Sequence, residues 1–242
     1  MRIYFLLVDE PFYTPACVGP LVDRFAPMIA GAGFPSGFFD WKRFRTTLAV
    51  QGLLTTAGKA AGMAMATLRG GVVHRQFRAR GIPVRDVSDV NAPEFLDDLR
   101  RLGIDLIVSI NTPQRLKRPI LALPERGCLN VHFGMLPRYR GLMPIFHAIM
   151  NGEPSFGVTV HFMDEKLDNG DIVAQRAIPI GAADSLDTLY PKAFAVASDL
   201  LAEAIDASAS GAVTRRPNPE AQKTYYSYPT RDQIQAYRRR CT

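Results

Sequence analysis

Cysteine is scarce in this 242-residue sequence, which has only three, Cys17, Cys128 and Cys241. No two of them are close enough in the chain to suggest a disulfide pair or a metal-binding pair. A zinc ribbon and a disulfide-stapled secreted domain are therefore excluded. We expect a protein of a reducing compartment, the cytoplasm, that holds no metal.

Long apolar runs are also missing. The run from Met1 to Asp9 is short and ends in acids, which is typical of a first strand rather than a signal peptide. The window Leu48–Leu68 is rich in Ala and Gly, but Gln51 and Lys59 interrupt it. Because a bilayer span needs about 20 consecutive, predominantly apolar residues, we expect a buried or interfacial helix there and no membrane partner.

The positive charge of the chain is not concentrated in any one segment. The net charge is +6, from 29 Lys and Arg against 23 Asp and Glu. No run combines aromatic and basic residues in the way that single-strand nucleic-acid binders do. We therefore expect the basic bias to serve an anionic small molecule, and we do not expect a nucleic acid partner.

The order of apolar segments predicts the fold class. Short apolar runs alternate with amphipathic segments from Met1 to Phe133, which predicts an α/β protein with a doubly wound, mostly parallel, Rossmann-like sheet. Expected helices cover Leu21–Ala30, Thr47–Leu68, Asn91–Leu102 and Ser185–Ser208, expected later strands cover Phe156–Met163 and Ile172–Ile180, and the Phe-rich segment Gly31–Thr47 is expected to be a packed loop or helix over the sheet. We expect one main domain over residues 1–211 and a short C-terminal tail over residues 212–242.

Glycine is absent where a phosphate-binding turn would need it. The turn-rich segment Asp9–Pro15 follows the first strand and contains no glycine. A glycine-rich turn lets the backbone and a helix N-terminus approach a phosphate closely. A phosphate site at this turn is therefore not predicted.

Two polar residues interrupt the apolar run from Cys128 to Phe133. Asn130 and His132 are two residues apart, so in a strand their side chains lie on one face. They stand just before a loop rich in Gly, Pro and Arg, at the strand end where α/β sheets bind ligands. Spacing alone favours a satisfied buried pair over a catalytic one, but a second polar stretch, Gly157–Val173, changes this interpretation.

The motifs Asn-x-His (from Asn130), Leu-Pro-x-Tyr-Arg-Gly (from Leu136), Gly-Val-Thr-Val (from Gly157) and Leu-Asp-x-Gly (from Leu167) occur in this order. This order resembles the formyltransferase family that uses 10-formyltetrahydrofolate, which includes the methionyl-tRNA, glycinamide ribonucleotide and amino-sugar N-formyltransferases. The likeness runs from about Gly81 to Gly211.

The resemblance implies three catalytic residues, and their chemistry suits acyl transfer. The amide of Asn130 would donate to the oxyanion of a tetrahedral intermediate. His132 would move protons between the amine and the leaving nitrogen, and Asp168 would hold the imidazole in place. No residue has to be a nucleophile.

The resemblance also implies binding residues. The folate ring would meet the loop after the strand Asp105–Ile110 and the loop around Asp164–Gly170; the candidate contacts are Gln114, Arg115, Leu116, Met163 and Asp164. Arg138, Tyr139 and Arg140 would lie at the mouth of the site. Because a guanidinium fork suits phosphate, we expect one of these arginines to contact an anionic acceptor. His147 and His161 are expected to be structural.

The acceptor amine is predicted from what the chain lacks within this family. The turn after the first strand lacks the phosphate loop of glycinamide ribonucleotide enzymes, and a tail of about 30 residues is too short for an RNA-binding barrel domain. We therefore predict an amino sugar carried on a nucleotide, with the tail closing the site or supporting a homodimer. The alternatives are a formyltetrahydrofolate hydrolase, formylation of another amine such as an aminoacyl-tRNA, and an idle folate- or RNA-binding protein.

Overall fold

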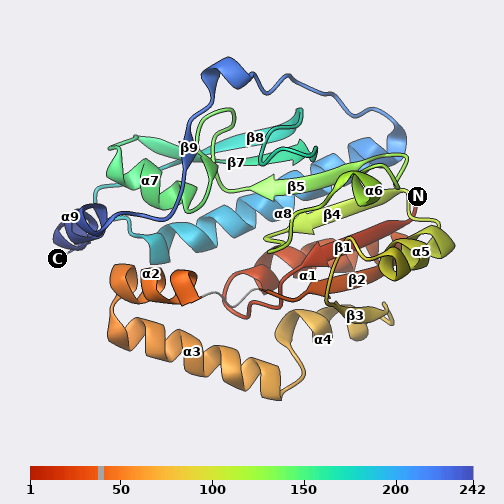
Figure 1. The fold of residues 1–242 in the computed structure, drawn as a ribbon, viewed down its shortest axis with the longest axis horizontal. Helices are drawn as coiled ribbons and strands as arrows, with labels where there is room; N and C mark the ends of the chain where they lie inside the picture. The colour runs from red at the N-terminus through yellow and green to blue at the C-terminus, as the bar shows by residue number, and fades with distance from the viewer. Residues whose placement is uncertain (38–40, 242) are drawn as a thin grey trace.

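The computed structural model describes residues 1–37 and 41–241, and over these residues seven strands form one central sheet (Figure 1). Its order is β3-β2-β1-β4-β5-β7-β8. The first five strands are parallel and β7 and β8 are antiparallel. The strands are β1 Ile3–Leu7, β2 Ile29–Pro35, β3 Val84–Val87, β4 Leu106–Ile110, β5 Cys128–His132, β7 Ser155–Phe162 and β8 Ile172–Pro179. The predicted mostly parallel, doubly wound sheet is confirmed.

Helices cover both faces of this sheet. The α-helices are α1 Thr14–Phe25, α2 Trp41–Gln51, α3 Leu53–Leu68, α4 Val72–Arg78, α5 Pro93–Leu102, α6 Arg118–Leu121, α7 Pro144–Met150, α8 Leu186–Ser210 and α9 Arg231–Cys241, with 3-10 turns η1 Ala26–Met28 and η2 Glu220–Gln222. Helix α8 packs against α1 and against β7 and β8. The longest helix thus joins the two halves of the sheet.

The alternation along β1 shows why two layers form. Ile3 and Phe5 are fully buried in the cluster that contains α1 and α8. Tyr4 and Leu6, which point the other way, belong to the cluster that contains α5. Successive strand side chains face opposite sides of a sheet, so a continuous apolar run is buried on both faces.

The prediction for residues 21–35 is wrong in part. Helix α1 ends at Phe25, and strand β2 occupies Ile29–Pro35, where we expected the end of a helix and a packed loop. Glycine suits position 31 of this strand because a Cβ there would stand 2.9 Å from the Tyr4 ring. Small residues have little strand propensity, so only the packing against β1 reveals the strand.

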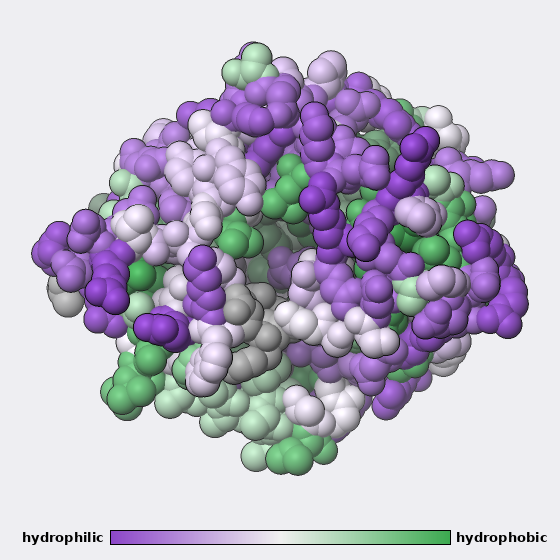
Figure 2. Space-filling view, in the orientation of Figure 1, coloured by the Kyte–Doolittle hydropathy of each residue, from purple (hydrophilic) through white to green (hydrophobic). Residues whose placement is uncertain are grey.

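The expected single helix over Thr47–Leu68 is two helices. Gly52, with φ 86°, separates α2 from α3. Along the outer side of α3, Leu54 and Leu68 are 89% and 83% exposed. That side of the helix is therefore not buried, and the interfacial alternative that we named stays a prediction. Figure 2 shows apolar residues along the lower edge of the molecule. Phe38 and Phe39 of the Phe-rich segment lie outside the described residues. Among the described helices, none is long and apolar enough to cross a membrane.

The tail returns along the molecule to its opposite end (Figure 1). Strand β9 (Tyr225–Tyr226) pairs in parallel with β6 (Arg140–Gly141), which lies in the loop after β5. Helix α9 then packs beside α2 and α7. The tail therefore contributes a strand and a helix next to the C-terminal ends of the sheet strands.

Replacing Gly31 with alanine is expected to destabilise the protein by about 1–3 kcal/mol, because the new methyl group overpacks the contact with Tyr4. Urea unfolding measures this change. The matched control is Gly58→Ala on α3, where nothing lies within 4 Å of the added Cβ; it should leave stability unchanged or raise it by up to about 1 kcal/mol. Equal effects at both positions would contradict the assigned strand packing.

Candidate active site

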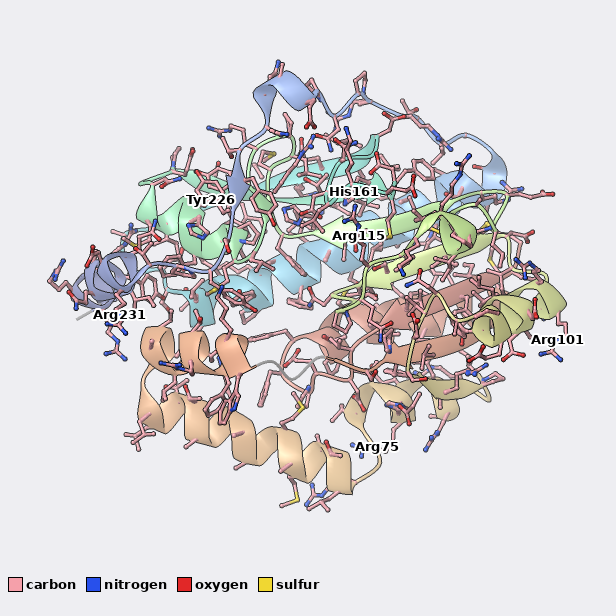
Figure 3. All side chains as sticks on the ribbon, viewed as in Figure 1. Arg75, Arg101, Arg115, His161, Tyr226 and Arg231 are labelled. Carbon is pink, nitrogen blue, oxygen red and sulfur yellow. The ribbon has the colours of Figure 1, made fainter. Side chains whose placement is uncertain are left out.

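Four polar residues meet where β5 and β7 lie side by side. In the antiparallel register, Asn130 stands opposite His161 and His132 stands opposite Thr159. Residues directly opposite each other share one face of a sheet. Nδ2 of Asn130 lies 3.2 Å from Nε2 of His161 (labelled in Figure 3).

Asp168 completes the group from the loop between β7 and β8. Its Oδ1 lies 3.5 Å from Nδ1 of His132 and 3.9 Å from Nε2 of His161. Its Oδ2 accepts the backbone N–H of Gly141 at 2.8 Å. Both histidines and Asp168 are buried. We call Asn130, His132, His161 and Asp168 the polar cluster; it brings together all three predicted catalytic residues and adds His161.

The hydrogen bonds fix where the imidazole protons lie. Nε2 of His132 is 2.7 Å from the carbonyl oxygen of Tyr139. A carbonyl can only accept, so this nitrogen carries a hydrogen. Nδ1 of His161 likewise donates to the carbonyl of Phe162 at 2.7 Å. Its Nε2 is then free to accept an N–H of Asn130, which sets the orientation of that amide.

His161 is neutral at pH 7. The pKa of His161 is lowered to about 4, mainly by burial and also by nearby His132, against the opposing effect of the Asp168 carboxylate. His161 was expected to be structural, and its contact with Asn130 was missed. The alternation of Thr159 and His161 along one strand was the available signal, but the pairing with β5 could not be read from it.

Two further residues hold the loop after β5. The hydroxyl of Thr159 donates to the carbonyl of Gly134 at 2.7 Å. The amide of Gln175 on β8 donates to the Thr159 oxygen at 2.8 Å and to the carbonyl of Leu136 at 2.9 Å. The loop that carries β6 is thereby tied to the antiparallel strands.

Arg140 does not lie at the mouth of the site, which corrects our expectation. Its guanidinium is buried and bonds Asn169 at 2.8 Å, Glu220 at 2.7 Å and Asn218 at 2.9 Å. Arg140 therefore anchors the tail to the Asp168 loop, and its head group does not face an acceptor.

The other two residues expected at the mouth of the site, Arg138 and Tyr139, differ in their exposure. The hydroxyl of Tyr139 donates to Glu153 at 2.7 Å, and its ring is buried. Arg138 also pairs with Glu153, at 3.1 Å, but its side chain is 51% exposed. Of the three expected acceptor contacts, Arg138 alone has an exposed side chain.

The loop after β4 also departs from expectation in part. The amide of Gln114 accepts from the backbone of Val90 and donates to the carbonyls of Ser36 and Ser88, so it ties β2 to β3. Leu116 is buried in the core, whereas Arg115 is exposed. A folate ring could therefore meet this loop through its backbone or through Arg115.

Met163 and Asp164 line a pocket of about 430 Å³ between the Asp168 loop and the tail. Met163 packs against the same apolar cluster as Leu116, so the two expected folate loops adjoin each other. Asp164 accepts from Asn169 at 2.6 Å. The volume lies in the range of small-ligand sites.

The N-terminus of α1 is already occupied by a carboxylate of the chain itself. Glu10 is buried, and its oxygens accept the backbone N–H groups of Phe12, Tyr13 and Thr14 at 2.6–3.1 Å. A helix N-terminus is a ready site for an anion. Here Glu10 takes the position that a phosphate would need.

Neither a reactive thiol nor a metal site is found among the described side chains. Burial raises the pKa of the Cys17 and Cys128 thiols to about 12, so neither is a thiolate nucleophile at neutral pH. Within residues 1–37 and 41–241, no group of three His, Cys, Asp or Glu side chains is placed to hold a metal ion.

We expect stability to fall as the pH drops from about 6.5 toward 4. In that window the unfolded chain protonates His161 while the folded chain keeps it neutral, so protons favour unfolding. His161→Gln should flatten the curve of unfolding free energy against pH by at most about 1.4 kcal/mol per pH unit. Urea unfolding at pH 8, 6 and 5 measures the slopes; identical slopes for both proteins would contradict a neutral His161.

The comparisons with known proteins show the family of this chain. The formyl transferase family profile matches residues 47–205. The methionyl-tRNA formyltransferase of Moorella thermoacetica is 43% identical over 147 residues, 61% of this chain and 47% of that protein. The same enzyme of a Roseiflexus species is 34% identical over 76% of this chain and 56% of its own length. The chain thus spans about half the length of these curated relatives.

Solved structures share the fold. A sugar N-formyltransferase from a Shewanella species superposes with TM-score 0.63 at 17% identity, over 97% of this chain and 86% of that one. Glycinamide ribonucleotide transformylase 1 from Symbiobacterium toebii gives 0.63 at 19% identity, over 92% of each chain. At such identities the likeness establishes the fold alone.

Proposed function

Because this chain belongs to the formyl transferase family, we propose that it transfers the formyl group of 10-formyltetrahydrofolate to a primary amine, and that this amine is carried by an aminoacyl-tRNA, methionyl-tRNA first. The observation that carries the proposal is the polar cluster. Its amide, imidazoles and carboxylate lie together at the end of β5.

The choice of acceptor follows the sequence relatives and revises our first prediction. Two methionyl-tRNA formyltransferases are 43% and 34% identical over 61% and 76% of this chain, whereas the likeness to sugar enzymes is one of fold. An amino sugar without a nucleic acid partner is therefore less well supported than the alternative we named. Cytoplasmic location and a homodimer stay predictions.

A glycinamide ribonucleotide acceptor is the least supported of the family's substrates. Its phosphate would need donors at the turn after β1. Glu10 already holds the free N–H groups at the start of α1, and its negative charge repels an added phosphate.

The folate fits the surroundings of the cluster as a substrate. It would supply the one-carbon group, with its ring beside Met163 and the backbone of the Gln114–Leu116 loop, which adjoin one apolar cluster. The buried carboxylate and imidazoles stand in a site from which water is largely excluded, where hydrogen bonds to developing charge are strong.

Each cluster residue then has a defined task. Asn130 uses one N–H on His161, so its second N–H can donate to the formyl oxygen as negative charge develops. The amine nitrogen bonds the formyl carbon, and the bond from that carbon to the folate nitrogen breaks. His132 carries the proton from the amine nitrogen to the folate nitrogen. Asp168 faces Nδ1 of His132, which is the nitrogen available for that exchange because Nε2 is held by Tyr139.

Asn130→Ala and His132→Ala are each expected to lower kcat for formyl transfer by about 100-fold or more, because each removes a group that acts on developing charge. Formylated product is measured by mass spectrometry with methionyl-tRNA, nucleotide-linked amino sugars, glycinamide ribonucleotide or no amine present. Arg75→Ala on α4, far from the cluster (Figure 3), is the control and should stay within about twofold of wild type.

The acceptor panel separates the candidate functions. Product from methionyl-tRNA alone supports the proposal, whereas product from amino sugars alone restores our first prediction. Release of formate without any amine would identify a hydrolase. Wild-type turnover by His132→Ala would contradict the proposed proton transfer by His132.

A further inference from the structure

A second, larger cavity lies away from the folate loops, between helices α2 and α9. Its volume is about 790 Å³, and Ala49 and Ile234 are among the residues that line it. The two helices come from opposite ends of the chain and pack beside each other. We call this cavity the α2–α9 pocket.

The lining of the pocket is basic and aromatic. Lys42 and Arg45 reach it from α2 and Arg231 from the first position of α9, and no carboxylate is among the described residues that line it. Both arginines are exposed. Trp41 also lines the pocket and is 68% exposed.

This combination of groups matches one ligand chemistry. Guanidinium forks bind phosphate oxygens in pairs, and an exposed indole offers a face on which a base stacks. A phosphate alone would leave the indole without a stacking partner, and an apolar ligand would leave the three cations without an anion. A nucleotide uses both.

Contacts through the tail join the pocket to the polar cluster. The ammonium of Lys42 lies over the Tyr228 ring, 5.2 Å from its centre. Two residues earlier, the Tyr226 ring stacks on Tyr139 at 5.1 Å. The carbonyl of Tyr139 holds His132. Figure 1 places α2 and α9 at the end of the molecule toward which β4 and β5 point.

The cationic and aromatic side chains of the pocket lie outside the segment shared with the family, although Ala49 lies inside it. The matched segment covers residues 47–205, whereas Trp41, Lys42, Arg45 and Arg231 all fall outside it. The polar cluster and both folate loops fall inside it. The cationic and aromatic side chains of the pocket therefore lie in segments that flank the matched one.

We infer that the α2–α9 pocket binds a nucleotide of the formyl acceptor, with its phosphates on Lys42, Arg45 and Arg231 and its base on Trp41. As a statement about the acceptor, this inference rests on the proposed transferase function. The phosphate-and-base chemistry is common to the end of an RNA and to a nucleotide that carries an amino sugar.

Trp41 gives a direct readout, because it is the only tryptophan of the sequence. Titration of the protein with ADP or UDP should change its fluorescence saturably, and adenosine, which lacks phosphate, should bind at least about tenfold more weakly. The double variant Arg45→Ala/Arg231→Ala should weaken ADP and UDP binding at least about tenfold. Unchanged fluorescence with ADP, UDP and uncharged tRNA, or equal binding of adenosine and ADP, would overturn the inference.

A matched control removes two arginines elsewhere. Arg100→Ala/Arg101→Ala takes the same charge from α5, which lies at the far end of the molecule from Arg231 (Figure 3). The affinity of this control variant for ADP and UDP should stay within about twofold of wild type. The slope of log affinity against log salt concentration should become smaller only in the pocket variant, by about one per lost phosphate contact. An equal loss in both variants would show a general charge effect and no site.

The acceptor assay tests the link to catalysis. For the acceptor that the protein formylates, the pocket variant should raise KM about 10–100-fold and leave kcat within about twofold, because the lost contacts do not touch the reacting atoms. Tighter binding of uncharged tRNA than of UDP assigns the pocket to an RNA end, and the reverse assigns it to a nucleotide-linked sugar.

The two proposals fail separately. The fluorescence titration contains neither folate nor amine, so nucleotide binding without any formyl transfer would defeat the transferase assignment and keep the pocket. Formyl transfer with an unchanged KM in the pocket variant would defeat the pocket's role and keep the transferase.

Discussion

The buried carboxylate of Asp168 connects the parts of the molecule that form the site. It faces His132 on β5 and accepts the N–H of Gly141 on β6, while its own backbone carbonyl accepts Asn218 of the tail. A buried charge is costly unless polar partners surround it. The loop can deliver it only because Asp168 adopts φ 50° and Gly170, whose added Cβ would stand 2.0 Å from the Phe162 carbonyl, leaves room for the close turn.

The cluster uses two histidines in different ways, and their surroundings decide which is which. His161 is enclosed, donates to one backbone carbonyl and remains neutral, so it serves as a fixed acceptor for Asn130. His132 has a carbonyl on one nitrogen and a carboxylate facing the other. The imidazole of His161 thus orients an amide, whereas the imidazole of His132 lies between a carbonyl and a carboxylate oxygen, which suits the proton transfer that we propose.

The polar cluster and the basic groups of the α2–α9 pocket come from different parts of the chain. The cluster and the folate loops come from the segment shared with the family, and Arg140, first assigned to the acceptor, instead bonds that segment to the tail. The basic side chains of the α2–α9 pocket come from the flanking segments. Under the functions that we propose, family membership is informative about the donor half of the reaction and less so about the acceptor half.

Local patterns in the sequence determined the fold class and three of the four cluster residues, Asn130, His132 and Asp168. Period-two spacing puts Asn130 and His132 on one face of β5 whatever surrounds them, and an apolar run such as β1 must be buried. The ordered motifs added Asp168. None of this needed knowledge of a distant contact.

Only the tertiary structure decided what covers each of these groups. Gly31 reads as a loop until the Tyr4 ring is placed against it, and Arg140 reads as a free cation until the tail brings Asn218 and Glu220 to it. His161 became part of the cluster through its register with β5, and the α2–α9 pocket exists because residues about 190 apart in the chain pack together. Periodicity is a property of neighbouring residues, whereas burial and pairing depend on segments that meet only after folding.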